Sequence, residues 1–259
     1  MEETQAMQAE ETVEAGKAAI VEQEGAMGEA GPGPEEEANS ALVALLAQQA
    51  AGYELLGRLF QREVDGELLQ SLCEGRYPAH TGNAHLDEGY RGLVVFLNHR
   101  GERTRTQLNV DYLHTFIGNT QDASHAAYPY ESVYTSPEHL LMQDARDAVL
   151  AAYRSEKVAL VNEHNEPEDH IGFELAFCAV LLRRAGEALE AGDLAKTAAL
   201  VEKERAFVRD HLAAWAPEFA SDVARVAQTG FYRALSELLL GYLEVDTATM
   251  EAVAGELAE

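Results

Sequence analysis

Residues 166–193, EPEDHIGFELAFCAVLLRRAGEALEAGD, decide the fold. After Pro167, a residue that favours the first position of a helix, apolar side chains recur every three or four residues. This spacing places them on one face of an α-helix. The apolar face carries Ile171, Leu175, Cys178, Leu181 and Leu182. The pattern stops near Gly192, and Asp193 is a typical cap for a following helix, so the stretch predicts one long amphipathic helix.

The same helical spacing covers most of the chain on either side of this stretch. β-branched alternation is nearly absent, and 158–161 is the single strand-like run. Two breaks interrupt the pattern, at 119–136 and 155–166. The expected helices are 40–63, 65–74, 86–100, 104–117, 137–154, 167–192 and 193–215, then two more delimited by Pro217 and Gly230, and a short last one from Asp246. We therefore predict an all-α fold, a single globular bundle of about nine or ten helices without internal repeats.

Local signals set several of these helix bounds. Ser40 and Asp65 are expected N-caps, because their side chains accept hydrogen bonds from the first turn. Ser136 followed by Pro137 is the cap-then-proline pattern that starts a helix. Gly118 is expected to end one. The longer break therefore lies between two helices with defined ends.

The chain of 259 residues is strongly acidic. It has 19 Lys and Arg against 45 Asp and Glu, which gives a formal net charge of -26. Binding to nucleic acid or to anionic membranes is disfavoured, because both need clustered basic side chains. No apolar run approaches the ~18–20 residues that span a bilayer. We expect a cytoplasmic protein with a basic partner.

Residues 1–39 differ in composition from the rest of the chain. They contain eleven Glu, one Lys and no aromatic residue. Such a segment buries too little apolar surface to offset the entropy of ordering, so we expect a disordered acidic tail and a globular domain at 40–259. The tail either keeps the protein soluble or steers a basic partner by its charge. The two cysteines, Cys73 and Cys178, lie far apart in the sequence and are expected to be reduced thiols.

The first break contains YPYESVY at 128–134. Three tyrosines and a proline in seven residues form a semi-rigid surface that suits an apolar peptide. Alternatively, the rings fill a gap between helices.

The second break leads into Glu168, Asp169 and His170. In a helix that begins at Pro167, the two carboxylates lie in the first turn, where the helix dipole favours negative charge. They either stabilise the helix start or accept hydrogen bonds from a cationic ligand.

An enzymatic role has little support in the sequence. No motif for nucleophilic catalysis, phosphate binding or dinucleotide binding occurs. His170 and Glu174 share a helix face, and with His164 they form a weak metal-binding pattern. A small helical metallohydrolase is therefore a distant alternative, and we expect no catalytic residue, no metal and no other cofactor.

Several blocks of the chain together resemble the TorD/DmsD family of redox-enzyme maturation chaperones. They include the family's P-x-D-H helix start, its aromatic helix end and its P-[YW]-x-S-V-[YW] loop. The matching blocks are 111–118, 129–134, 166–177, 207–215 and 231–235. They occur in the family's order and cover 40–245.

The resemblance implies an all-helical cytoplasmic chaperone and not an enzyme. Family members bind the twin-arginine signal peptide of a molybdenum-cofactor oxidoreductase of the dimethyl sulfoxide or trimethylamine N-oxide reductase type, and hold it until the cofactor is inserted. The residues that it implies for signal-peptide binding are Tyr112, Phe116, Pro129, Tyr130, Ser132, Tyr134, Asp169 and His170. Two alternatives stay open: a NarJ-like assembly chaperone for a nitrate-reductase-type subunit without export proofreading, and a homodimer that exchanges helices across the breaks.

Such a signal peptide joins a pair of cationic arginines to an apolar stretch, so its receptor needs an apolar groove with acidic groups at one end. The rings expected to line the groove are Tyr112, Phe116, Tyr130 and Tyr134. The expected acidic groups are Glu131, Glu168 and Asp169. As a hypothesis, Asp169 pairs directly with an arginine side chain and His170 orients it.

Overall fold

The structure is a computed structural model that describes residues 33–118, 126–160 and 165–258. Ala38–Glu259 form one compact unit. Most of the predicted acidic tail, residues 1–32, lies outside the described residues. The helix α2 (Pro34–Gln61) begins before Ser40, so the predicted cap there is wrong. Proline at the first position and the alanine and glutamates after it favour this earlier start.

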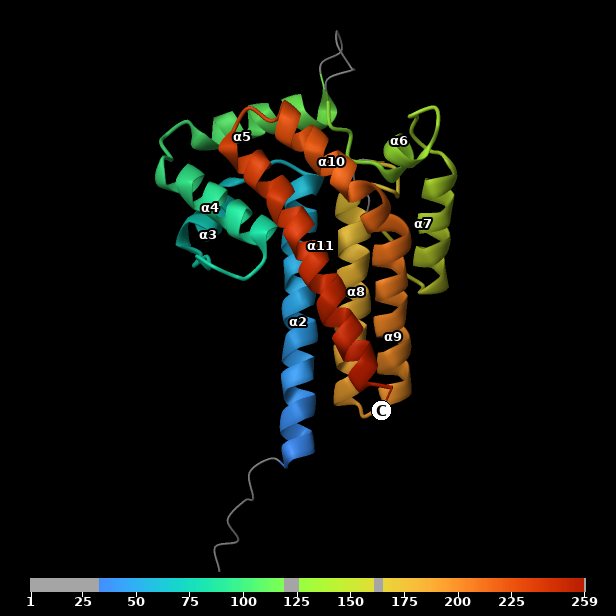
Figure 1. The fold of residues 1–259 in the computed structure, drawn as a ribbon. Helices are drawn as coiled ribbons and strands as arrows, with labels where there is room; N and C mark the ends of the chain where they lie inside the picture. The colour runs from blue at the N-terminus through green and yellow to red at the C-terminus, as the bar shows by residue number, and fades with distance from the viewer. Residues whose placement is uncertain (1–32, 119–125, 161–164, 259) are drawn as a thin grey trace, which may run out of the picture. The chain divides into compact units, whose positions relative to one another are not determined.

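The described residues are helices joined by short connections, and none of them forms a strand (Figure 1). The helices after α2 are α3 (Gly66–Glu74), α4 (Ala84–Asn98), α5 (Thr104–Tyr112), α6 (Glu131–Thr135), α7 (Asp144–Ser155), α8 (Ile171–Glu190), α9 (Leu194–Phe207), α10 (Ala213–Val226) and α11 (Gly230–Glu256). Two π-helical segments, η2 (Leu113–Ile117) and η4 (Val208–Leu212), follow α5 and α9. The predicted all-α bundle is confirmed for this part of the chain, and no described helix is long and apolar enough to cross a membrane.

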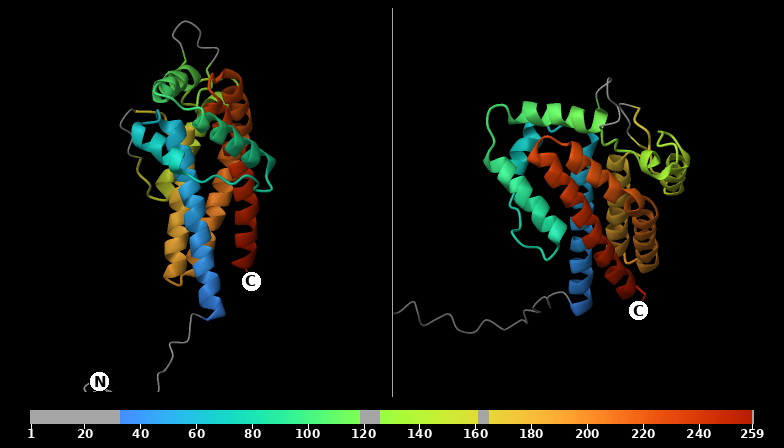
Figure 2. Two further views of the ribbon diagram at one scale, coloured as in Figure 1. Left: turned by 90° about the vertical axis from the view of Figure 1, so that its left-hand side faces the viewer. Right: turned by 45° about the horizontal axis from the view of Figure 1, so that its top comes forward.

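The core is built around α8, the helix predicted from residues 166–193. The five residues of its predicted apolar face are fully buried. α8 packs against α9, and α2 and α11 lie close to it in both Figure 1 and Figure 2. α2 and α8 come into close contact at Gly57 and Gly172, where a Cβ added to either glycine would lie 2.9 Å from the other's carbonyl oxygen. Glycine at both positions therefore permits this helix crossing.

α4 and α11 form a second close interface in the same unit. A Cβ added at Gly89 would lie 2.6 Å from the Leu238 side chain. A Cβ added at Gly241 would lie 2.6 Å from the backbone nitrogen of Leu86. Small residues thus let the two helices approach until their backbones are nearly in contact.

Several predicted helix ends are confirmed. Asp65 Oδ1 accepts a hydrogen bond from Leu68 N–H at 2.8 Å and caps α3. Asp193 Oδ1 accepts one from Lys196 N–H at 3.0 Å and caps α9. Gly118 follows η2 with a φ of 80°, a conformation that favours glycine.

The predicted helix start at Ser136 and Pro137 is wrong. Ser136 instead ends α6, and α7 begins at Asp144. Between them, His139 and Met142 have φ values of 51° and 59°. These left-handed conformations interrupt a right-handed helix, so residues 137–143 form a loop.

The predicted start of α8 at Pro167 is also wrong, because His170 is its N-cap and Ile171 its first residue. Glu168 and Asp169 therefore precede the helix. The backbone of 169–171 bonds to the other break instead of continuing the helix toward its N-terminus.

Two expected breaks near the C-terminal end lie inside helices. Pro217 is within α10, close to its start and just after η4, where the hydrogen-bond register changes. Asp246 is buried inside α11 and accepts a hydrogen bond from the Tyr53 hydroxyl at 2.7 Å. The strand-like run is no strand in its described part, Val158 to Leu160. Among the described residues, Cys73 and Cys178 are free, as expected.

Candidate functional site

The two breaks in the helical pattern meet at one place, which we call the break junction (128–132 and 166–171). Tyr130 and His170 form an isolated antiparallel bridge there. The flanking backbone hydrogen bonds run from Glu131 N–H to the Asp169 carbonyl at 3.0 Å, and from Ile171 N–H to the Pro129 carbonyl at 2.9 Å. Six of the nine predicted site residues lie in this junction: Pro129, Tyr130, Glu131, Ser132, Asp169 and His170.

Asp169 holds the junction together through its side chain. Its Oδ2 accepts a hydrogen bond from Ser132 N–H at 2.8 Å, in the first turn of α6. The residue is 0% exposed, and burial raises the pKa of its carboxyl group, opposed by the hydrogen bonds from Ser132. Among the described residues, Oδ1 has no hydrogen-bond partner. Asp169 therefore positions the start of α6 and, in this conformation, does not reach solvent.

His170 has a similar positioning role at the start of α8. Its Nδ1 accepts a hydrogen bond from Gly172 N–H at 2.9 Å, and its ring packs edge-on against Tyr130 with centroids 5.2 Å apart. Burial lowers the pKa of His170 to about 3. The ring is therefore neutral at physiological pH and acts as a buried cap.

Behind the junction lies a buried group of carboxylates that the sequence did not predict as a unit. Glu131 Oε2 is 2.9 Å from His211 Nδ1, and Glu174 Oε2 accepts a hydrogen bond from Trp215 Nε1–H at 3.2 Å. Burial, and then the charge of Glu131, raises the pKa of Glu174 well above its ordinary value. Glu131, predicted to face a ligand, thus points into the core toward His211.

Two of the four predicted groove aromatics belong to a buried aromatic cluster next to the junction. Tyr112 and Phe116 are 5% and 1% exposed, and the Tyr112 hydroxyl donates to the Phe60 carbonyl at 3.0 Å. Phe116 packs edge-on against Phe60, with centroids 5.8 Å apart. Tyr134 is partly exposed and stacks on Trp215 at 5.4 Å. Tyr112 and Phe116, expected to line the groove, are therefore core residues in this conformation.

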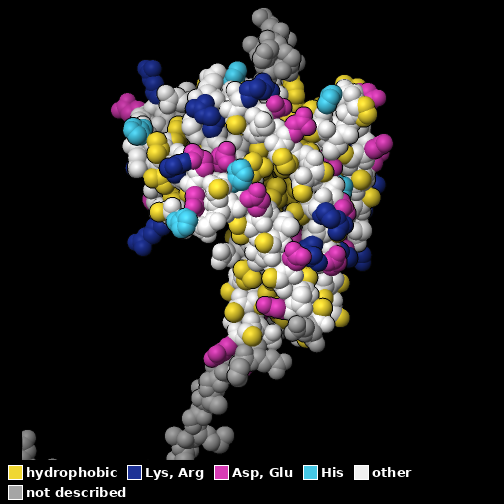
Figure 3. Space-filling model, viewed as in Figure 1, with side chains coloured by type: hydrophobic (Ala, Val, Ile, Leu, Met, Phe, Trp, Pro, Cys, Tyr) yellow, Lys and Arg dark blue, Asp and Glu magenta, His cyan; other side chains and the backbone are white. Residues whose placement is uncertain are grey.

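The outer face of the junction is acidic and partly apolar. Tyr130 donates a hydrogen bond to Glu166, and Arg146 of α7 pairs with Glu168. Beyond them, the loop 137–143 exposes large apolar side chains. Figure 3 shows hydrophobic and acidic side chains side by side at the upper right, over α6 and α7. The sequence signal for this surface was a run of three consecutive apolar residues, 140–142, which the helical pattern wrongly placed inside a helix.

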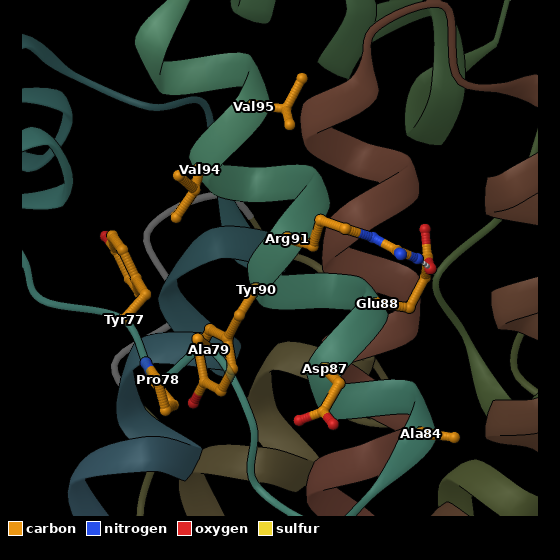
Figure 4. Close-up of a pocket in the computed structure, with 10 residues that line it drawn as sticks. All are labelled: Tyr77, Pro78, Ala79, Ala84, Asp87, Glu88, Tyr90, Arg91, Val94 and Val95. Carbon is orange, nitrogen blue, oxygen red and sulfur yellow. Dashed lines mark ion pairs between the residues drawn. The ribbon is translucent and has the colours of Figure 1, made fainter.

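A separate cavity of about 570 Å³ lies between α4 and the segment before it (Figure 4). The rings of Tyr77 and Tyr90 form one wall, with centroids 5.9 Å apart. Its acidic groups are satisfied within the protein: Asp87 binds Thr81 and His80, and Glu88 pairs with Arg91. None of the predicted site residues lines it.

The weak metal pattern gains no support from the described residues. They contain no group of three or more His, Cys, Asp or Glu side chains arranged to hold a metal ion. Glu174 points toward Trp215, and the Nδ1 of His170 is occupied as a cap. His164, the third member of the pattern, lies outside the described residues.

Comparison with known proteins finds a matching family model and several relatives of this chain. A family model described as "Nitrate reductase delta subunit" matches residues 83–221. A protein named "Chaperone protein TorD" from Photobacterium profundum is 31% identical over 161 residues, which cover 62% of this chain and 71% of that protein. Proteins of the same name from Aliivibrio salmonicida and Vibrio vulnificus are 29% and 28% identical, and the matches cover 81% and 77% of this chain and 96% and 93% of theirs.

Proposed function

Because the chain belongs to the TorD/DmsD-type family of redox-enzyme maturation chaperones, we propose that it binds the twin-arginine signal peptide of a molybdoenzyme precursor. It is a chaperone and not an enzyme. In the cytoplasm it holds the peptide back from export until the molybdenum cofactor has been inserted into the client enzyme. That client is an oxidoreductase of the dimethyl sulfoxide or trimethylamine N-oxide reductase type.

The observation that carries this proposal is the break junction. The bridge between Tyr130 and His170 brings together two segments that are far apart in the sequence. Exposed apolar and acidic side chains lie beside the junction, in the loop 137–143 and the first turn of α7, as a cationic and apolar peptide requires. The net charge of -26 favours encounter with a basic leader over long distances.

The burial of Asp169 and His170 refines their proposed roles. A fully buried carboxylate cannot pair with an arginine side chain unless the junction opens. The exposed carboxylates at its rim, Glu138, Asp144 and Asp147, are reached without any rearrangement. We assign the guanidinium contacts to this rim and the positioning of the surface to Asp169 and His170.

Calorimetric titration with the leader peptide of a candidate client tests the proposal. A matched peptide with both arginines changed to alanine is the control. Ion pairs with exposed carboxylates contribute about 0.2–1 kcal/mol each, so loss of both arginines should weaken binding by about two- to thirtyfold. Absence of binding to any twin-arginine leader would contradict the proposal.

A second function is favoured by the description of the matching family model, which names a nitrate reductase subunit. In that case the chain assembles a nitrate-reductase-type subunit and recognises its apolar leader segment only. Equal affinity for the intact leader and for the alanine control would support this alternative. Light scattering on the same samples would show whether the chaperone binds as a monomer or as a helix-exchanged dimer.

A further inference from the structure

The loop 137–143 between α6 and α7 exposes three consecutive large apolar side chains. Leu140, Leu141 and Met142 are 57%, 44% and 60% exposed. An apolar group of this kind is costly to leave in water and commonly marks an interaction surface. Methionine is frequent on surfaces that accept varied apolar partners, because its side chain is flexible and polarisable.

The loop is held in a defined conformation. The His139 ring donates from Nδ1 to the Val133 carbonyl at 2.8 Å. Gln143 Nε2 donates to the Leu141 carbonyl at 2.8 Å. His139 and Met142 adopt left-handed backbone conformations, which non-glycine residues rarely take. Specific contacts thus keep the apolar side chains exposed instead of letting them fold onto the core.

The loop is connected to the break junction through one buried side chain. Ser132 Oγ accepts a hydrogen bond from Gln143 N–H at 3.1 Å, at the end of the loop. The backbone N–H of the same residue donates to Asp169 Oδ2. Ser132 and Asp169 are both 0% exposed. A continuous chain of hydrogen bonds therefore runs from the second break to the loop.

We propose that the loop 137–143 is the docking surface for the apolar stretch of the signal peptide, and that Ser132 and Asp169 are positioning residues for it. This inference rests on the proposed function and names the surface that performs it. The buried residues of the junction act on the peptide through the loop and do not touch it.

The charged side chains beside the loop 137–143 indicate which partner binds it. Glu138, Asp144 and Asp147 are exposed beside the apolar side chains. The nearby cation, Arg146, is paired with Glu168 and Asp147. An anionic lipid surface is repelled by this rim, and so is a second copy of a chain with a net charge of -26. A peptide that carries arginines beside an apolar stretch complements both parts of the surface.

The first test changes the three loop residues together, with Leu140→Ser, Leu141→Ser and Met142→Ser in the full chain. The matched control changes three comparably exposed residues of α5 and η2, Val110→Ser, Leu113→Ser and Ile117→Ser, which are 57%, 48% and 53% exposed. The loop variant should bind the leader peptide at least tenfold more weakly than the wild type. The control variant should stay within twofold, and both should melt within a few degrees of the wild type.

The outcomes of this test separate the two proposals. Leader binding by the wild type with equal affinity in the loop variant overturns the docking surface and leaves the proposed function standing. No leader binding by the wild type overturns both. Equal weakening in the loop and control variants shows that apolar exposure in general, and not this loop, governs binding, and it also overturns the inference.

The positioning role is tested by a double-mutant cycle on leader affinity. Ser132→Ala removes the acceptor for Gln143 N–H and should weaken leader binding several-fold in the wild-type background. In the loop variant the same change should have no further effect, because the positioned side chains are already absent. Equal losses in both backgrounds would show that Ser132 acts elsewhere and would overturn its assignment.

Discussion

Two regions of the molecule place polar and apolar side chains in opposite ways. One is the interface between α4 and α11, and the other is the break junction. At the interface, apolar residues are buried around Gly89 and Gly241, as helical periodicity predicts. At the junction, Asp169 is buried, while the neighbouring loop exposes Leu140 and its two apolar neighbours.

Because of this difference, one region contributes to the stability of the fold and the other to binding. Buried polar groups are costly unless hydrogen-bonded, and exposed apolar groups gain nothing for folding. The interface thus stabilises the unit, whereas the junction holds a surface that a partner completes. Changes at the interface should affect folding and leave binding intact, and changes at the junction should affect binding more than folding.

The largest effect is expected from Gly241→Val at the interface. The added Cβ would lie 2.6 Å from the backbone nitrogen of Leu86, so the two helices must separate. We expect a loss of about 3 kcal/mol or more in the free energy of unfolding, measured by urea denaturation. Gly186→Ala in α8 is the control, because nothing lies within 4 Å of its added Cβ. This control should gain up to about 1 kcal/mol from helix propensity, and a loss of similar size in both variants would contradict the account.

A second effect concerns Asp246, a buried carboxyl of the helical region. Burial raises its pKa to about 6. Because the folded pKa is raised, its favourable contribution is complete below about pH 4 and is lost as the pH rises through about 6. The free energy of unfolding of the wild type relative to Asp246→Asn should therefore fall between pH 4 and pH 7, a loss that Asp246 shares with Glu204, whose pKa it raises.

The exposed Asp147 provides the control for this pH dependence, since its side chain is 78% exposed. Asp147→Asn removes one carboxylate without disturbing the core, so it measures what the change in net charge alone does over the same range. A difference for Asp246→Asn that matches this control would show that burial does not raise the pKa of Asp246.

A smaller loss of stability is expected from Asp169→Ala at the junction. Removing the carboxylate leaves the buried N–H of Ser132 without its acceptor, which costs about 2 kcal/mol. Asp169→Asn retains an acceptor oxygen and should recover most of that loss. Thermal denaturation measures the stability and leader titration the affinity. If the alanine variant keeps both, the positioning role is refuted.

The smallest effect is expected from deleting residues 1–32. The deletion removes eight Glu and one Lys, and most of the negative charge stays on the compact unit. The free energy of unfolding should change by less than about 0.5 kcal/mol. The association rate with a basic leader at low salt should fall by no more than about twofold, as stopped-flow fluorescence can measure. A larger fall that salt abolishes would favour the steering role of the tail.

The helix ends that the sequence predicted correctly depend on contacts within one turn. Asp65 and Asp193 bond to amides three residues ahead, and Gly118 supplies a left-handed conformation. The start predicted at Pro167 failed because the backbone of 169–171 bonds to the other break, which is distant in the sequence. The start predicted at Ser136 failed because His139 and Met142 adopt left-handed conformations, which non-glycine residues rarely take and the sequence does not signal.

The sequence predicted which residues form the candidate site, but not whether their side chains face solvent or the core. The motif blocks located Tyr130, Ser132 and Asp169, and the structure brings all three into one junction. Their burial could not be predicted, because a tyrosine or an aspartate in a break has the same local sequence whether it faces solvent or the core. The exposed Leu140 and its neighbours carry no motif, and their role depends on the fold around them.

Amide hydrogen exchange with and without the twin-arginine leader tests the central claim most directly, because it locates the bound peptide on the full-length chain. We predict slowed exchange in 128–143 and 165–171, with no change in α4 and α11. The leader with alanines in place of its arginines should give weaker protection at the same positions. Protection confined to the cavity around Tyr77 and Tyr90, or absent from the junction at saturating peptide, would contradict the account.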